Sequence, residues 1–162
     1  MNRNRVLSFV LLAGLPWLAA QAAATGAGVV RHGLEGTDFP ISMAVEVAPS
    51  ATLVELSGVT ASDLHARQGI VSLTEAQTVS AFDSLRANLK RLGLGLKDVV
   101  RLRVYLVADG TQPMDLAGFQ RGYVRFFGTA EQPALPSRTV VQVVGLTQPG
   151  ALVEIEATAV RH

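Results

Sequence analysis

The sequence of 162 residues contains no cysteine, and this absence excludes much of protein chemistry at the outset. Without cysteine the chain cannot form disulfides, thiolate nucleophiles, iron–sulfur centres, cysteine-ligated zinc sites or a lipid-modified N-terminal cysteine. Charged residues are also few, at 17% of the chain. With 49% hydrophobic residues, 15 Gly and 7 Pro, the composition excludes disordered, collagen-like and coiled-coil chains. The length therefore predicts one globular domain with a buried core.

Motifs for metals, nucleotides and nucleophilic catalysis are absent as well. The histidines, His32, His65 and His162, are far apart in the sequence, and no His-x-x-x-His or paired carboxylates occur at ligand spacing. There is no Gly-x-Ser-x-Gly, no Walker-type loop, and no Gly-x-Gly-x-x-Gly that opens a helix. We therefore expect no metal site and no cofactor.

Residues 1–24 have the pattern of a secretory signal peptide. Arg3 and Arg5 give a short positive start, an apolar run follows over residues 6–20, and Ala-rich small-x-small sites come next. The alternative is an uncleaved membrane anchor, but the run is short for a span and is interrupted by Gly14 and Pro16. We predict a cleaved signal, no stable membrane anchor after cleavage, and a periplasmic or secreted mature protein.

The mature chain would lack the positive charge that a polyanion needs. Cleavage removes two of the 14 basic residues, Arg3 and Arg5, and leaves 12 against 13 acidic residues. No cluster of lysine and arginine is interleaved with aromatic residues. Nucleic-acid binding is therefore not expected.

The first part of the mature chain predicts a loose arm followed by strands. Residues 25–38 are rich in glycine and suggest a flexible N-terminal arm, so that the folded domain would span residues 39–162. Apolar residues alternate over 43–47 and 52–57, on either side of a Pro49-Ser50 turn, which predicts a β-hairpin. Residues 61–69 suggest a loop, and 70–71 a short strand.

Two helices are predicted with strands between and after them. Ser72-x-x-Glu75 is a capping box, apolar residues follow at spacings of three and four, and Gly93 has the position of a C-terminal cap. Residues 100–106 alternate as a strand, and an aromatic stripe predicts a second helix over 115–128. Further strands are expected at 139–144 and 151–160.

This order of elements predicts an α+β fold, a single mixed β-sheet with two helices on one face. The opposite face of the sheet is rich in Val and Ala, so we expect it to pack against another subunit.

Arg138 and a pair of glutamates are the candidate functional residues. Arg138 is isolated between Pro136-Ser137 and an apolar strand, where its planar guanidinium could bind a carboxylate. Glu154 and Glu156 interrupt the last apolar strand on one face. Taken alone, these residues do not establish a function.

Seven segments carry a resemblance to a known family, in the same order along the chain. They are residues 40–45, 57–58, 75–78, 98–100, 123–127, 136–141 and 153–157. Together they resemble the RidA (YjgF, L-PSP endoribonuclease) family over nearly the whole mature chain.

The resemblance implies a chorismate-mutase-like fold, a homotrimer with three clefts between subunits, and hydrolysis of enamine or imine intermediates to 2-oxo acids and ammonia. Arg138 matches the family arginine that binds the substrate carboxylate, and Glu154 the acidic residue that positions the attacking water. Ser57 and Gly58 match the segment whose backbone faces the substrate. Such a reaction, resembling that of 2-iminobutanoate/2-iminopropanoate deaminases, needs no cofactor.

Four positions depart from the family pattern. Ile41 replaces a tyrosine and Met43 a glutamine, Gln120 replaces an asparagine, and Val140 stands where a cysteine is common. These changes make the cleft more apolar. They keep open an alternative function, a non-catalytic trimeric protein that binds a small carboxylate such as a 2-oxo acid. Ribonuclease activity, reported under the family's older name, is poorly supported by the near-neutral mature chain.

Overall fold

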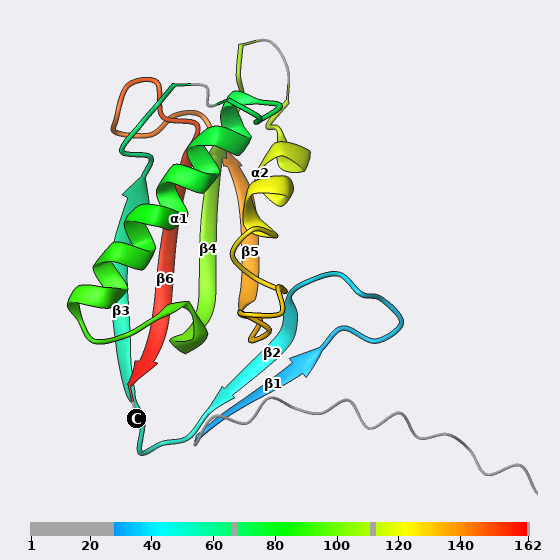
Figure 1. The fold of residues 1–162 in the computed structure, drawn as a ribbon, viewed down its shortest axis with the longest axis vertical. Coiled ribbons are helices and arrows are strands. Elements are labelled where there is room, and N and C mark those ends of the chain that lie inside the picture. Colours follow the sequence, from blue (N-terminus) through cyan, green and yellow to red (C-terminus); the bar gives the residue numbers. More distant parts are fainter. Residues whose placement is uncertain (1–27, 66–67, 111–112, 162) are drawn as a thin grey trace, which may run out of the picture.

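Two β-sheets and two α-helices make up the fold of the described residues (Figure 1). The computed structural model describes residues 28–65, 68–110 and 113–161. The strands are β1 (Val29–Gly33), β2 (Ser42–Val47), β3 (Thr52–Thr60), β4 (Val99–Val107), β5 (Ser137–Val143) and β6 (Val153–Arg161). The larger sheet has the order β3-β6-β4-β5, and only its β4–β5 pair is parallel. It is therefore mixed, which confirms the α+β class.

Both helices cover the same face of the larger sheet, as the element order predicted (Figure 1). They are α1 (Leu73–Arg91) and α2 (Leu116–Tyr123), and a short 3₁₀ turn, η1 (Leu96–Asp98), precedes β4. The side chain of Ser72 caps α1 by accepting the N–H of Glu75 at 3.2 Å. Gly93 adopts a φ of +73°, which a side chain would strain, and ends the helix as expected.

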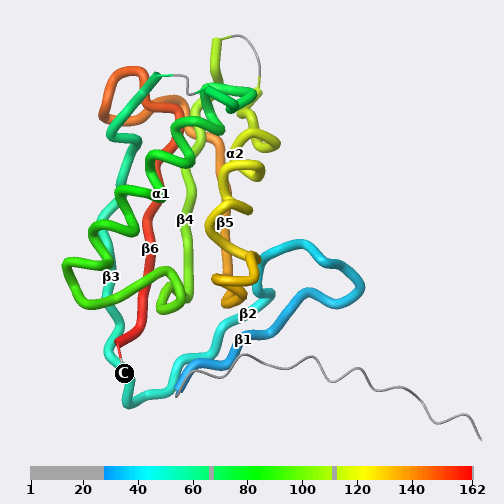
Figure 2. The backbone as a smooth tube through the Cα atoms, in the orientation of Figure 1, coloured from blue at the N-terminus to red at the C-terminus, as the bar shows by residue number. Residues whose placement is uncertain are grey.

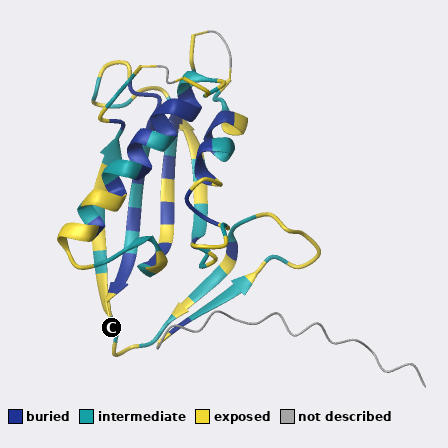
Figure 3. Ribbon diagram, in the orientation of Figure 1, coloured by how far each residue is buried: buried dark blue, intermediate teal, exposed yellow. Residues whose placement is uncertain are grey.

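The core lies between the helices and the sheet, where the buried residues of α1, β4 and β6 face one another (Figure 3). Along β4, Leu102, Val104 and Leu106 are buried, whereas the alternate residues Arg101 and Arg103 are exposed. The Phe82 ring of α1 is at the centre of the aromatic cluster that the second stripe predicted, and it contacts Phe119, Tyr123, Phe126 and Phe127.

The sheet pairing corrects the expectation of a single sheet. β2 pairs with β1 to form a separate two-stranded sheet, and β3 pairs with β6, so the predicted 43–47/52–57 hairpin is wrong. Figure 2 shows β1 and β2 diverging from the larger sheet below β5. β2 pairs with the strand just before it, in the segment expected to be an arm, and β3 pairs with β6 about 100 residues further along the chain, so the alternation within 43–57 does not determine either partner.

Three smaller expectations also change. β1 lies within residues 25–38, the segment expected to be an arm, and it is fixed by Arg31, whose guanidinium donates to three backbone carbonyl oxygens at 2.7 to 3.0 Å. Residues 70–71 form no strand. α2 ends at Tyr123, short of the predicted 128, because tight turns replace the helix after Val124.

The segment predicted to be a signal peptide, residues 1–24, lies outside the described residues. Within the part of the chain that is described, no helix has the length and apolar character to cross a membrane.

Candidate functional site

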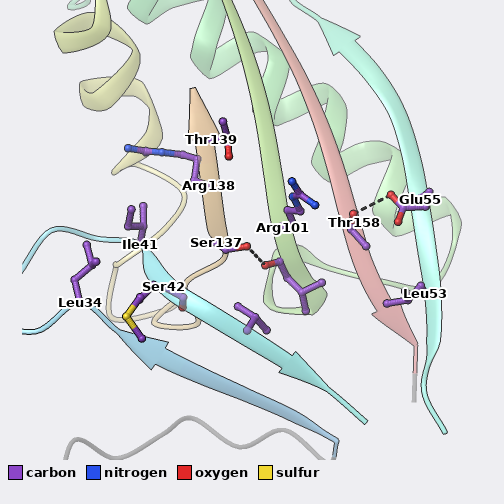
Figure 4. Close-up of a pocket in the computed structure, with 13 residues that line it drawn as sticks. Leu34, Ile41, Ser42, Leu53, Glu55, Arg101, Ser137, Arg138, Thr139 and Thr158 are labelled. Atoms are coloured by element: carbon purple, nitrogen blue, oxygen red, sulfur yellow. Dashed lines mark hydrogen bonds between the residues drawn. The ribbon is translucent and has the colours of Figure 1, made fainter. Parts of the chain in front are cut away.

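Arg138 lies near the start of β5, opposite Leu102 of β4 in the parallel register. Because Leu102 belongs to the core beneath the helices, this register directs the Arg138 side chain to the helix-covered face. Figure 4 shows the side chain extending away from β5. Its Nη2 donates a hydrogen bond of 2.9 Å to Oε1 of Gln120, a residue of α2.

Three aromatic rings surround the guanidinium of Arg138. Its Cζ is 4.3 Å from the ring centroid of Tyr123, 5.2 Å from that of Phe119 and 5.4 Å from that of Phe39. Nη1 is buried and has no hydrogen-bond partner among the described residues. Burial lowers the pKa of Arg138 from its usual value, but an arginine keeps its charge. The pocket formed by these three rings thus contains a charged guanidinium that can donate a further hydrogen bond through Nη1.

Tyr123 connects this pocket to the loop before β2. Its hydroxyl donates to the carbonyl oxygen of Pro40 at 2.7 Å. Burial raises the pKa of Tyr123 well above its ordinary range, so the phenol stays protonated and remains a donor. The hydrogen bond fixes the backbone next to Phe39 and Ile41.

Ser57 and Gly58 form a bulge in β3 beside Glu154. The β3–β6 register shifts between Leu56 and Val59, and a Cβ added to Gly58 would collide with Oε1 of Glu154 and lie 2.9 Å from its Cδ. Only a glycine permits this close approach. The structure therefore brings three of the four predicted site residues, Ser57, Gly58 and Glu154, into one place.

Glu154 lies on the face of the sheet that the helices leave uncovered. In register it is opposite Tyr105 of β4, and with Tyr105, Glu156 and the loop at Gly145 it lines a hollow of about 260 Å³. Arg138 is directed to the other face. Within one chain, therefore, the structure does not bring Arg138 and Glu154 together. The strand register shows the separation, since Arg138 is paired with the core residue Leu102 and Glu154 with the half-buried Tyr105.

A larger cavity of about 580 Å³ lies between the β1–β2 hairpin and the larger sheet (Figure 4). Ile41 and Met43, two of the departures from the family pattern, line it together with Arg101 and Ser137. Sequence reasoning missed Arg101, although its place on the polar side of an alternating strand was visible. The cavity wall is in part apolar, as the substitutions suggested.

The other two departures have different surroundings. Gln120 is the hydrogen-bonding partner of Arg138, so the replacement keeps a side-chain amide at the guanidinium. Val140 packs against the hydrophobic core. Among the described residues no three His, Asp or Glu side chains converge on a possible metal position; His162 lies outside them.

Comparison with known proteins is consistent with this fold. The Endoribonuclease L-PSP family matches residues 40–161. A protein of the conserved Rid family from Yersinia pestis is similar at 27% identity and a TM-score of 0.62, over 82% of this chain and 98% of that one. A YjgF family member from Mycobacterium tuberculosis is similar at 30% identity and a TM-score of 0.53, over 81% of this chain and 98% of that one. No curated protein matches the sequence. The match over residues 40–161 and these relatives show that the chain belongs to the RidA (YjgF, L-PSP) family.

Proposed function

We propose that this protein hydrolyses imines and enamines that carry a carboxylate, releasing a 2-oxo acid and ammonia. The observation that carries the proposal is Arg138, a half-buried arginine whose Nη1 is buried and has no hydrogen-bond partner among the described residues. An unpaired buried donor is costly, and a carboxylate is the group whose two oxygens match the planar guanidinium. The free side of Arg138 is thus suited to the acid group of such a substrate.

The reaction requires that the substrate be held in a fixed orientation and that a water molecule be directed at its imine carbon. Arg138 holds the carboxylate, and the Glu154 carboxylate accepts a proton from water as the water oxygen adds to the imine carbon. The electron pair of the C=N bond moves to nitrogen, which takes up the proton. The resulting carbinolamine loses its hydroxyl proton to the amine, the C–N bond breaks, ammonia leaves and the carbonyl forms. An enamine first becomes the imine by taking up a proton at carbon and losing one from nitrogen.

The proposed active site is made from two chains. Arg138 and Glu154 are on opposite faces of the sheet, so a substrate that touches both requires Glu154 from a second copy. The face uncovered by the helices supports this arrangement, because it carries exposed apolar side chains at Leu53 and Val141. We propose the homotrimer with intersubunit clefts that the family resemblance implies.

The proposal includes export. If residues 1–24 are cleaved as a signal peptide, the enzyme meets its substrate in the periplasm or outside the cell. Its natural substrate would then be an imine or enamine present in that compartment.

A second candidate function is binding of a small carboxylate without turnover. It is favoured by the apolar side chains of Ile41 and Met43, which leave the cavity wall near Arg138 with fewer hydrogen-bonding groups. Under this alternative Arg138 would still bind the acid, and no reaction would follow.

The experiment that tests the proposal follows hydrolysis of 2-iminopropionate made in situ by an amino-acid oxidase. Semicarbazide traps the remaining imine, so a slower formation of the semicarbazone reports enzymatic hydrolysis. The wild type, Arg138→Ala, and the control Arg86→Ala, which removes an exposed arginine of α1, are compared as folded proteins. We expect acceleration by the wild type and Arg86→Ala, and none by Arg138→Ala. A folded wild type that binds pyruvate but gives no acceleration would support the binding function instead.

A further inference from the structure

Phe39 is the one ring at the Arg138 guanidinium that solvent reaches. The rings of Phe119 and Tyr123 are fully buried in the core, whereas Phe39 is 43% exposed and comes from the loop before β2. Its centroid is 5.4 Å from Cζ of Arg138. Phe39 therefore forms the outer wall of the guanidinium pocket.

The backbone after Phe39 is held in place on both sides. The Tyr123 hydroxyl donates to the carbonyl oxygen of Pro40, and the N–H of Ser42 donates to the carbonyl oxygen of Pro136 at 3.0 Å. Among the described residues, the ring contact of Phe39 is the one with the Arg138 guanidinium.

The position of the ring determines what can approach Arg138. Nη1 is buried, and the exposed ring of Phe39 is one of the three rings around the same guanidinium. A ligand whose carboxylate binds the guanidinium on its solvent side would bring its carbon chain close to this ring. Ile41, which is drawn beside Arg138 in Figure 4, adds a second apolar surface. These surfaces favour a ligand whose side chain is apolar and large.

We infer that Phe39 determines specificity, and that the site prefers imino acids and 2-oxo acids with a bulky apolar or aromatic side chain over the smallest ones. The inference rests on the proposed function, because it assumes that Arg138 binds the carboxylate. Phe39 acts here as a specificity-determining residue that contacts the side chain of the ligand. Arg138 binds the carboxylate, and Glu154 and water carry out the reaction.

Calorimetric binding of two 2-oxo acids tests this inference. Pyruvate and phenylpyruvate share the carboxylate and the ketone and differ in the side chain. We expect wild type to bind phenylpyruvate roughly ten-fold more tightly, the scale on which apolar pockets discriminate small groups. Phe39→Ala is expected to reduce the ratio to near one, Phe39→Tyr to keep it, and the control Val124→Ala, which truncates an exposed apolar residue following α2, to leave it unchanged.

The outcomes separate this inference from the proposed function. If Arg138→Ala binds both acids as tightly as wild type, carboxylate binding by Arg138 is wrong and the proposed function fails with it. If Arg138→Ala abolishes binding but folded Phe39→Ala retains the full preference, the inference about Phe39 alone is wrong. A wild type that binds both acids equally also overturns it.

Discussion

Replacing Glu75 by glutamine tests the contact that holds α2 against α1. The Glu75 side chain is 2% exposed, and its two carboxylate oxygens accept hydrogen bonds of 2.7 Å from Arg121 and from Arg125. Gln120, the partner of Arg138, is next to Arg121 on α2. Glu75→Gln removes the charge with little change in shape and leaves both arginines without their carboxylate.

The expected cost follows from these contacts. Two charge-assisted hydrogen bonds contribute about 1.5–3 kcal/mol each when desolvated. Arg121 and Arg125 are 41% and 48% exposed, so water replaces part of what they lose. We expect a loss of about 2 kcal/mol in the free energy of unfolding. For a domain of this size that lowers Tm by roughly 4–8 °C.

The same substitution changes the response to acid. The hydrogen bond from Arg121, together with smaller contributions from Arg125, holds the pKa of Glu75 below its usual value although burial opposes this. Its contribution to stability is therefore present above the unfolded-state pKa of about 4.3 and is lost as pH falls through the lower folded-state pKa. Glu75→Gln should reduce the loss of stability below that pH.

Urea denaturation at pH 7 and at acidic pH measures both effects. The control is Glu46→Gln, which removes the exposed carboxylate paired with His32 on the hairpin and should change stability by less than about 0.5 kcal/mol. A Glu75→Gln protein as stable as the control at pH 7, with the acid response of wild type, would refute the reasoning.

Three further substitutions test packing and the site. Gly122→Ala places a Cβ 2.6 Å from Cγ2 of Thr78, where α2 crosses α1, and should lower the free energy of unfolding by about 1–3 kcal/mol. Thermal denaturation measures this, and an unchanged Tm would contradict it. Gly58→Ala displaces the Glu154 carboxylate and should lower imine hydrolysis at least about ten-fold in a folded protein, whereas wild-type activity would separate the bulge from catalysis. Arg31→Ala removes three hydrogen bonds to carbonyl oxygens and should lower the urea stability by about 2 kcal/mol; equal stability would show that they contribute nothing.

Local signals in the sequence predicted the local structure well. Ser72 and Gly93 bound α1 as their residue types indicate, and the alternation along β4 correctly separated Leu102 from Arg101 and Arg103. Each of these features depends on residues within a few positions of one another, where propensity and periodicity act.

Features that depend on distant residues could not be predicted in this way. The capping box predicted that the Glu75 side chain binds the backbone at the start of its own helix. In the structure its carboxylate instead accepts hydrogen bonds from Arg121 and Arg125, which are 46 and 50 residues further along the chain. Arg138 was identified as an isolated arginine at a strand start. Its surroundings, Phe39, Phe119 and Tyr123, come from other elements and are assembled only by the fold.

The central claim, a site made from Arg138 of one chain and Glu154 of another, is tested most directly by mixing two inactive variants. Arg138→Ala and Glu154→Gln are unfolded together, refolded in equal amounts, and assayed for imine hydrolysis. If each site takes one residue from each of two neighbouring copies, random assembly restores about a quarter of the wild-type activity. Activity no greater than that of the separate variants, from mixed oligomers shown to have formed, would contradict the account.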